Sequence, residues 1–571
     1  MTSSTGVPDP SQAIEHCPSE RPAKEFSRRT LLACAGALAA APMIGNMRPA
    51  SAAEQNSVSP LAVPKAPPGT PLPGFVKWKH AVGDPRGSDV VAVFGRNTEA
   101  RFGTMFKDLQ PYTPDERLLR DLAYAMTETR GPTDDIVPDG KDNVDMPSGY
   151  IYLGQFIDHD MTRDTTPLTD ARQDPHALRN YDTPQFDLGS VYGAGPTGSP
   201  ELYDADGKHL LLRVNTNGLL DLPRDGMGTA YVGDPRNDEN LIIAQMQMAF
   251  IMLHNRFLEN QAAGNFVRAQ QLTQWHFQWV IVHDFLPHVV GQALVDSLVV
   301  NTGSTVRATT RFYKPGNPYR PMMPIEYSAG AYRWGHSGIR PEYEMHDFVR
   351  VGHNPAVLPI FDSNPDPSNA RDLRGSRPLY ADATIDWNYF FEIPGVQSPT
   401  DTNFARLIDT EVARPLLELP DSVVAHVSGA ILALAERNLL RGNRLGLPCG
   451  QDVAAAMRRE LPLNPAPLTN TELDPDGRFG LANTAWGGKA PLWFYCLQEA
   501  AIIGKGKKLG PVAGRIVAEV ILGLLQHDKL SYWNARSAFV PVGGPQFRMG
   551  HLLKLAEAPI FDPQTKQPIF S

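Results

Sequence analysis

The sequence predicts a mainly α-helical protein organised as one large domain, and three observations support this class. Residues 241–259 are apolar on almost every side, which is typical of a helix buried in a large core. Strand-forming runs are few and short. Between Gly74 and Ser571 there is no internal repeat and no low-complexity break that would separate a second domain.

The composition fits a globular protein and excludes some partners. With 571 residues and 42% hydrophobic content, the chain is long enough to bury a large core. The formal charge is −9 with acids and bases scattered, so we expect no nucleic-acid-binding face. The 52 prolines and 48 glycines are also spread out, which predicts many short connections between helices. Cys449 and Cys496 form either one disulfide or two free buried thiols.

The N-terminal segment is similar to a twin-arginine export signal. Arg28 and Arg29 precede an apolar run at 31–45, and residues 50–52 offer small side chains for cleavage. A membrane anchor is the weaker alternative, because about 20 apolar residues are needed to cross a bilayer. Cys34 follows the arginines too closely for a lipoprotein signal. We therefore predict a signal at 1–52, a Pro-rich linker at 53–75, a domain at 76–571, no stable membrane span, and a periplasmic or extracellular location.

Four segments have the length and periodicity of long helices. The first is Leu241–Glu259, where Asp234-Pro235 supplies an N-cap acceptor and a proline suited to a first turn. The others are Leu272–Leu298, which we expect to break at Pro287, then Val423–Leu440, and Val512–Leu525 with two glycines as mild breakers.

The segment from Gly154 to Asp164 places an imidazole among carboxylates in an otherwise apolar stretch. In a helix, Gln155, Asp158 and His159 would stand at i, i+3 and i+4 and share one face. Asp160 would be turned about 100° from His159, away from that face. We therefore expect one face to meet a substrate while Asp160 serves another purpose.

Two further clusters are less specific on their own. Arg236 and Glu239 stand three positions apart at the start of the long apolar helix, where a structural salt bridge is the simpler interpretation. His336 follows a glycine that would let a bulky group approach closely. A lone histidine is nevertheless more often a surface or core residue than a metal ligand.

Taken together and in order, four segments resemble the animal-type haem peroxidases of the peroxidase-cyclooxygenase superfamily. The family's motifs are Gly-Gln-Phe-x-Asp-His-Asp, Gly-Asp-x-Arg-x-x-Glu running on to His-Asn-Arg, the proximal Arg-x-Gly-His, and a segment with the asparagine partner of the proximal histidine. They are matched by Gly154–Asp160, by Gly233–Glu239 with His254–Arg256, by Arg333–His336, and by Asn438–Gly442. The resemblance spans roughly residues 75 to 450, and we expect the remainder to belong to the same domain.

The resemblance implies haem b bound by the proximal motif. His336 would ligate the iron, and Asn438 would accept its other ring proton and raise its basicity. Arg333 of the same motif is assigned to the cofactor-binding residues. On the other side of the haem, His159 would be the acid-base group. It would take a proton from hydrogen peroxide and return it to the leaving oxygen.

Two further residues complete the implied distal side. Arg236 would stabilise negative charge as the O–O bond breaks, leaving an oxidised ferryl haem. Gln155 would hold a distal water or halide. Asp158 and Glu239 match the family's two carboxylates that become ester-linked to haem methyl groups. Asn240 stands where some members have a methionine bonded to a haem vinyl group, so that third linkage is absent, which argues against chloride oxidation.

A calcium site is also implied by the resemblance. The family pairs the aspartate at Asp160 with a loop that here precedes Val191-Tyr192-Gly193. Oxygen ligands suited to calcium would come from Asp160, Thr183, Asp187 and the Gln185 carbonyl. Gly189 occupies the position where relatives have serine or aspartate, with Ser190 or water as the substitute ligand.

The predicted function is a haem peroxidase that reduces hydrogen peroxide and oxidises small donors such as phenols, iodide or bromide. A haem-dependent fatty-acid dioxygenase is one alternative, but those enzymes start the substrate radical at a tyrosine three residues before the proximal histidine. Here that position is Arg333, and Tyr332 lies one residue further away. A haem-retaining adhesion or interaction protein is the other alternative, and the presence of both His159 and Arg236 argues against it.

Overall fold

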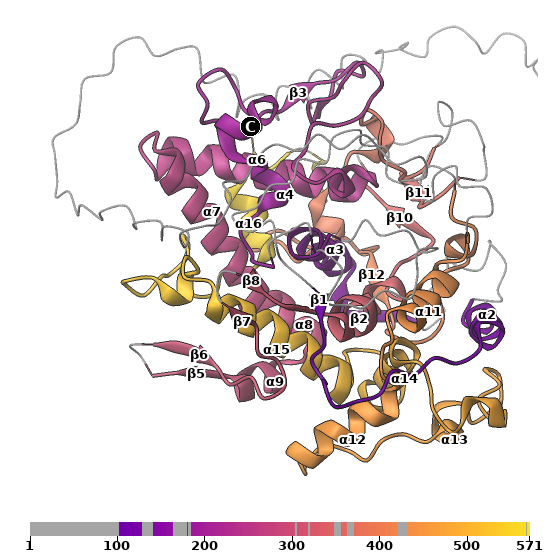
Figure 1. The fold of residues 1–571 in the computed structure, drawn as a ribbon. Coiled ribbons are helices and arrows are strands. Elements are labelled where there is room, and N and C mark those ends of the chain that lie inside the picture. The colour runs from indigo at the N-terminus through magenta and orange to yellow at the C-terminus, as the bar shows by residue number, and fades with distance from the viewer. Residues whose placement is uncertain are drawn as a thin grey trace, which may run out of the picture.

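The computed structural model describes residues 102–127, 141–163, 180, 184–302, 305–317, 320–347, 356–362, 371–420, 431–566 and 568–570. In these ranges helices predominate and the strands form short two-stranded pairs, which confirms the mainly α class (Figure 1). The predicted signal and linker lie outside the described residues, and the division into segments stays a prediction.

The α-helices of the described ranges are α2 (Glu116–Ala125), α3 (Gly149–Met161), α4 (Gly189–Tyr192), α5 (Gly195–Gly198), α6 (Leu241–Asn260), α7 (Phe266–Val280), α8 (Leu286–Val290), α9 (Gln292–Leu298), α11 (Leu434–Arg444), α12 (Gly450–Glu460), α13 (Asn470–Leu473), α14 (Leu492–Gly504), α15 (Pro511–His527) and α16 (Met549–Leu555). The strands pair as β1 (Phe102–Gly103) with β9 (Met323–Pro324), β2 (Asp142–Pro147) with β12 (Phe404–Arg406), β3 (Arg213–Val214) with β4 (Leu220–Asp221), β5 (Val299–Asn301) with β6 (Val306–Ala308), β7 (Gly316–Asn317) with β8 (Arg320–Pro321), and β10 (Glu342–Glu344) with β11 (Val357–Pro359). Only the first pair is parallel among those described.

Helix α6 is the long buried helix that the sequence predicts, but it begins later than Asp234 suggests. Its N-cap is Asn240, whose side chain accepts a hydrogen bond from the Ile243 backbone. Asp234 instead caps the short 3₁₀ helix η4 (Pro235–Asp238), which ends just before α6. Within the described ranges α6 alone is long and apolar enough to cross a bilayer, and 94% of its most apolar window is buried inside the protein. This burial is what a core helix requires.

The other predicted helices differ at their ends. The segment 272–298 runs through α7, a π-helical turn η5 (Ile281–Phe285), α8 and α9. Pro287 follows directly after the π-helical turn, in a helix that continues from η5 into α8, and the break comes at Gly291 with φ of 86°. Residues 431–433 are not helical and α11 begins at Leu434, while 423–430 lie outside the described residues. The prediction for Val512–Leu525 is confirmed by α15.

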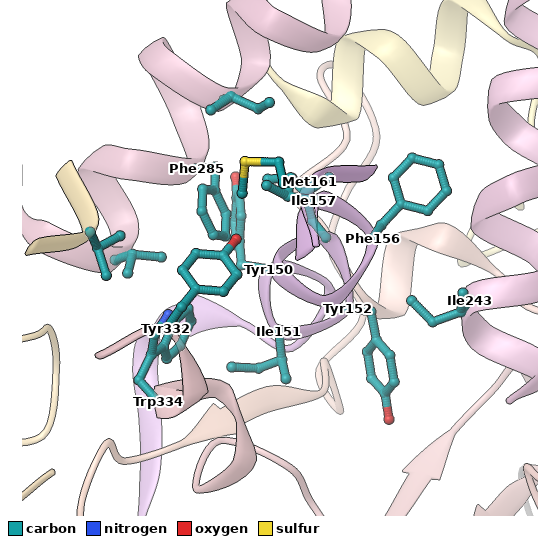
Figure 2. Close-up of a cluster of buried hydrophobic side chains, with 14 of the residues drawn as sticks. Tyr150, Ile151, Tyr152, Phe156, Ile157, Met161, Ile243, Phe285, Tyr332 and Trp334 are labelled. Atoms are coloured by element: carbon teal, nitrogen blue, oxygen red, sulfur yellow. The ribbon is translucent and has the colours of Figure 1, made fainter. Parts of the chain in front are cut away.

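Helix α3 lies at the centre of the core, surrounded by apolar side chains (Figure 2). Tyr332 and Trp334 lie against one side of α3. On α3, Phe156 stacks on Phe250 of α6 with ring centroids 4.8 Å apart. Gly154 lets Phe285 approach α3 closely, because a Cβ there would lie 3.3 Å from the Phe285 ring. Packing on several sides therefore fixes how the polar residues of α3 are aimed.

The two cysteines of the described region are free and buried, so the free-thiol alternative applies. Cys449 caps α12, where its sulfur accepts a hydrogen bond from the Asp452 backbone at 3.3 Å. Burial raises the pKa of the Cys449 thiol to about 12, which leaves it an unreactive thiol at neutral pH.

Candidate active site

Helix α3 presents three polar residues on one face, as the helical spacing predicts. Gln155 and Asp158 are half-buried, and His159 is 4% exposed. The Gln155 amide nitrogen donates to Glu239 Oε1, and its oxygen accepts from Asn240 Nδ2 at 3.4 Å. Glu239 Oε1 is also 3.7 Å from His159 Nε2. The residues around the start of α6 thus meet α3 at the expected distal side.

The His159 ring is held through its other nitrogen. Nδ1 lies 2.8 Å from the amide oxygen of Asn237. Because a carboxamide oxygen only accepts hydrogen bonds, the ring must carry its proton on Nδ1 in this contact. The lone pair of a neutral ring is then on Nε2, where a general base would need it.

Arg236 pairs with Asp234, which differs from the simple Arg236–Glu239 salt bridge that the sequence suggests. Its Nη2 is 2.7 Å from Asp234 Oδ2, and it also donates to the His159 carbonyl at 3.0 Å. Burial acts to raise the pKa of Asp234, but the positive charges of Arg236 and Arg163 outweigh it and hold this pKa well below its ordinary value. Asp234 therefore stays ionised and anchors the guanidinium beside the distal histidine.

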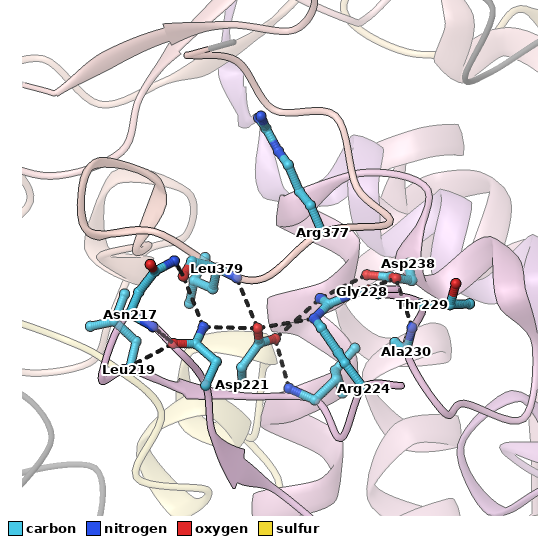
Figure 3. A network of polar contacts seen from close by, with 12 residues as sticks. Asn217, Leu219, Asp221, Arg224, Gly228, Thr229, Ala230, Asp238, Arg377 and Leu379 are labelled. Atoms are coloured by element: carbon cyan, nitrogen blue, oxygen red, sulfur yellow. Dashed lines mark hydrogen bonds and ion pairs between the residues drawn. The ribbon is translucent and has the colours of Figure 1, made fainter. Parts of the chain in front are cut away.

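A second ion-pair network holds η4 through Asp238 (Figure 3). Arg224 donates to Asp238 from both terminal nitrogens, at 2.7 and 2.9 Å, and to Asp221 at 3.0 and 3.1 Å. Asp221 also accepts from the Leu379 backbone at 2.8 Å. Gly375 lets the neighbouring loop approach, because a Cβ there would lie 1.9 Å from the Asp238 carbonyl. The segment carrying Arg236 is therefore clamped at its backbone and its side chains.

Asp160 points to another part of the molecule, as the sequence predicts. It is 2% exposed, and its carboxylate accepts from the backbone of Leu188 at 2.8 Å and of Ser190 at 3.3 Å. A Cβ on Gly189 would lie 3.3 Å from Asp187 Oδ1 and 4.0 Å from Asp160 Oδ1, so the two carboxylates border one spot.

The rest of the predicted calcium shell is less defined. Gln185 lies in the described segment 184–190, whereas Thr183 lies outside the described residues. Within the described ranges, no group of three or more His, Cys, Asp or Glu side chains is placed to hold a metal ion. The calcium site therefore stays a prediction.

His336 ends the 3₁₀ helix η7 (Ala331–His336) and contacts α11 through Asn438. Burial and the neighbouring Arg333 charge lower the pKa of His336 to about 3, so its ring is neutral at ordinary pH. A neutral imidazole is the form that can ligate a metal. His336 nevertheless keeps part of its surface exposed.

The amide of Asn438 is turned opposite to the prediction. Its oxygen accepts from Arg333 Nη1 at 2.7 Å, and its nitrogen lies 2.7 Å from His336 Nδ1. The guanidinium can only donate, so it draws the amide oxygen toward itself. Iron ligation through Nε2 requires a proton on Nδ1, and hence Asn438 Oδ1 accepting from both partners with its two lone pairs.

The sequence of this site also resembles a known family. Residues 155–379 match the family model of animal haem peroxidases. Over these residues the chain is similar to enzymes that are oxidoreductases and use haem. The matched range contains His159, Arg236 and His336 and ends before Asn438.

Solved structures agree on the fold of this family. Peroxidase A from Dictyostelium discoideum is 15% identical, covers 87% of this chain and 98% of its own, and superposes with a TM-score of 0.54. A fatty acid alpha-dioxygenase from Arabidopsis thaliana is 15% identical, with 84% and 81% covered and a TM-score of 0.52. An Oryza sativa fatty acid alpha-dioxygenase variant with palmitic acid is 16% identical, with 80% and 82% covered and a TM-score of 0.51. No curated protein sequence matches the chain significantly.

The residues present fit the haem of this family. Gln155, Asp158, Glu239 and His336 are each partly exposed, and we infer that they border one space between α3, the start of α6 and η7. The segment η7 packs against α3 at Gly335, where an added Cβ would lie 3.9 Å from Ile151. A neutral imidazole on one wall and polar groups on the other suit an iron porphyrin.

Sequence reasoning missed two residues of this site. Asn237 and Gln247 bond to each other at 2.8 Å behind His159. The residue types alone gave no signal, because their contacts depend on how η4 packs against α6.

Proposed function

We propose that this chain is a peroxidase that reduces hydrogen peroxide and oxidises small electron donors, namely phenols and the halides iodide or bromide. The observation that carries the proposal is the His159–Asn237 contact of 2.8 Å, which leaves Nε2 as a base. The neutral His336 on the opposite wall supports it, because iron ligation needs that form.

The chain's residues would divide the chemistry of peroxide reduction. Haem, held by His336, would supply the two electrons that reduce peroxide. His159 Nε2 would take the proton of the incoming peroxide and return it to the departing oxygen, so that water leaves. Arg236 would offset the negative charge that develops during O–O cleavage. Gln155, fixed by its bonds to Glu239 and Asn240, would orient a water or halide.

We also propose that Asp158 and Glu239 are the residues for ester links to haem methyl groups. Both carboxylates border the inferred space, and Asp158 Oδ1 accepts from Thr162 Oγ1 at 2.9 Å, which restrains its rotation. Glu239 is restrained by Gln155. Acid extraction tests this: haem should stay with the protein, and complete release would contradict both links.

The fatty-acid dioxygenase alternative is less favoured by the contacts of Tyr332. Its hydroxyl donates to the Gly154 carbonyl at 3.1 Å, and its ring stacks on Tyr327 at 4.5 Å between centroids. Burial raises the pKa of Tyr332 well above its ordinary value. The position three residues before His336 holds Arg333, which bonds Asn438.

An absorption spectrum of the purified protein, before and after stoichiometric hydrogen peroxide, tests the proposal. We expect a haem band that changes with peroxide and returns when guaiacol, iodide or bromide is added. Efficient lipid hydroperoxide formation from linoleate and oxygen, abolished in Tyr332→Phe, would favour the dioxygenase. Bound haem without any peroxide-dependent oxidation would favour the interaction protein, and purified protein without haem would contradict all three.

We further propose export by the twin-arginine route to the periplasm or beyond. The paired Arg28 and Arg29 ahead of an apolar run support it. Cell fractionation would contradict this proposal if the mature protein stayed in the cytoplasm.

Arg236→Ala is expected to retain haem and to slow the reaction with peroxide roughly a hundredfold to a thousandfold, the range for loss of one charge-stabilising donor. Stopped-flow absorbance of the haem band measures the rate. Arg236→Lys is the control, because it keeps a positive charge near Asp234 while losing the planar guanidinium.

The variant also tests a structural explanation. Removing Arg236 leaves the buried Asp234 with Arg163 at 4.0 Å as its remaining described cation, so thermal stability should fall. Loss of stability with an unchanged peroxide rate would assign Arg236 to structure alone.

Removal of calcium is expected to lower both thermal stability and the peroxide rate, the rate by about tenfold. We propose calcium at Asp160 and Asp187, and Asp160 positions the peptide of Ser190 behind the distal site. Elemental analysis should find stoichiometric calcium, which a chelator removes and added calcium restores. Asp187→Asn should weaken calcium retention. Purified active protein without calcium would contradict the site.

A further inference from the structure

We propose that Asn237 and Gln247 are positioning residues that hold the His159 proton on Nδ1 and so keep Nε2 available as the base. The inference rests on the proposed function, since it assigns a role within the same peroxide-reducing site. It concerns two side chains that do not face the inferred haem space themselves.

The hydrogen bonds form a chain with one allowed direction. Gln247 Nε2 is 3.4 Å from the Ser190 carbonyl, which only accepts. The Gln247 oxygen therefore faces Asn237 and accepts from its Nδ2 at 2.8 Å. The Asn237 oxygen is then left for His159 Nδ1 at 2.8 Å, and that nitrogen must donate. Turning over the Asn237 amide would set its oxygen against the Gln247 oxygen, and turning over the Gln247 amide would set its oxygen against the Ser190 carbonyl.

Burial makes this direction costly to reverse. Asn237 is 0% exposed, Gln247 1% and His159 4%, so solvent does not replace a lost partner. A buried donor or acceptor left without a partner carries a desolvation cost, which favours one tautomer by roughly fivefold or more. The structure thus enforces the tautomer through packing as well as hydrogen bonding.

The Ser190 carbonyl links the groups that hold His159 to the groups that hold Arg236. It accepts a hydrogen bond from Gln247, which bonds the Asn237 partner of His159. It also accepts from the backbone N–H of Asp234, the partner of Arg236, at 3.2 Å. Gly233 permits this approach, because a Cβ there would lie 2.6 Å from the Ser190 carbonyl. The shared Ser190 carbonyl therefore helps to fix the position of His159 relative to Arg236.

Several charged groups surround His159 and would affect its titration. Glu239 lies 3.7 Å from Nε2, Arg236 contacts the His159 carbonyl, and Asp234 pairs with Arg236. Asp158 and Asp160 flank it in the chain. All of these charged groups are unchanged in the variants below. A shift in the pH dependence of the peroxide rate would therefore report on the hydrogen-bond partner of His159 Nδ1.

The test compares Asn237→Asp and Gln247→Leu with the control Gln245→Leu. Gln245 is buried on the same helix and fully bonded, but to the backbone of Leu241, Ala383 and Ile385, away from His159. The measurement is the stopped-flow rate constant of the haem-loaded enzyme with hydrogen peroxide across pH, together with haem content.

Each variant has a distinct expected profile. In Asn237→Asp the carboxylate stabilises the charged imidazole, so the pH of half-maximal rate should rise by about one unit or more. In Gln247→Leu the Asn237 amide is free to turn, and the plateau rate should fall at least tenfold with haem retained, in the manner of a wrong histidine tautomer. Gln245→Leu should keep the wild-type profile.

The outcomes separate the inference from the proposed function. A wild-type profile in haem-loaded Asn237→Asp, or equal rates in Gln247→Leu and Gln245→Leu, would overturn the positioning role. Two positions carry the test, so misfolding of one variant leaves the other decisive. Misfolding of both while Gln245→Leu folds would assign the pair to stability and also overturn the inference. A wild-type enzyme with haem that does not react with peroxide would instead contradict the proposed function.

Discussion

His336→Ala is expected to lose most of its haem, with the ratio of haem absorbance to protein absorbance falling at least about tenfold, because the variant lacks the assigned iron ligand. The wild-type ring is suited to this role since it is neutral, with a pKa lowered to about 3 by burial and the Arg333 charge. The measurement is the absorption spectrum of protein purified under identical conditions. Added imidazole should restore part of the haem by occupying the space left behind.

His254→Ala is the matched control for a purely structural effect. His254 is fully buried on α6, away from His336, and it bonds the Tyr192 hydroxyl at 2.9 Å and the Lys208 carbonyl at 3.0 Å. We expect this control to lose stability and to retain haem. Normal haem content in His336→Ala, or equal haem loss in His254→Ala, would contradict the assigned ligand.

His159→Ala is expected to retain haem and to react with hydrogen peroxide roughly a hundredfold to ten-thousandfold more slowly, the range for loss of a general acid-base group. The reason is that Nε2 is the base that the Asn237 contact leaves available. The rate is measured by stopped flow at several pH values. The variant should also lose the acid limb of the pH profile, because the group that titrates there is gone.

The pH profile distinguishes catalysis from support of the fold. A variant slowed merely by loosened packing around α3 would keep the wild-type pH dependence. His159→Ala leaves the Asn237 oxygen without its ring partner, so a moderate loss of thermal stability is expected in either case. An unchanged rate, or a slow rate with an unchanged pH profile, would contradict the role of His159.

The prediction for the opening of the long helix shows where local sequence reasoning stops. Aspartate followed by proline is a typical helix start, and Asp234-Pro235 does start a helix, but a short 3₁₀ helix. Asn240 then caps α6 and also bonds Gln155. Asp234 and Asn240 therefore cap two successive helices, and the Asp234 N–H bonds the Ser190 carbonyl at the start of the first.

The orientation of the Asn438 amide was also not predictable from the sequence. The motif placed Asn438 beside His336, and the structure brings the two within 2.7 Å. The motif did not predict that Arg333 would donate a hydrogen bond to the amide oxygen of Asn438. That competition arises because η7 and α11 are distant in sequence and adjacent in space, so the donors around Asn438 are known only after folding.

The sequence by itself determined the helical class, the buried helix α6 and the common face of Gln155, Asp158 and His159, because apolar runs and the 3.6-residue period act locally. Its motifs also indicated the family. Only the tertiary structure decided the partners: Asp234 for Arg236, Asn237 for His159, and the backbone of Leu188 and Ser190 for Asp160. Hydrogen-bond partners and protonation depend on groups that approach from elsewhere in the chain, and burial then makes each choice costly to reverse.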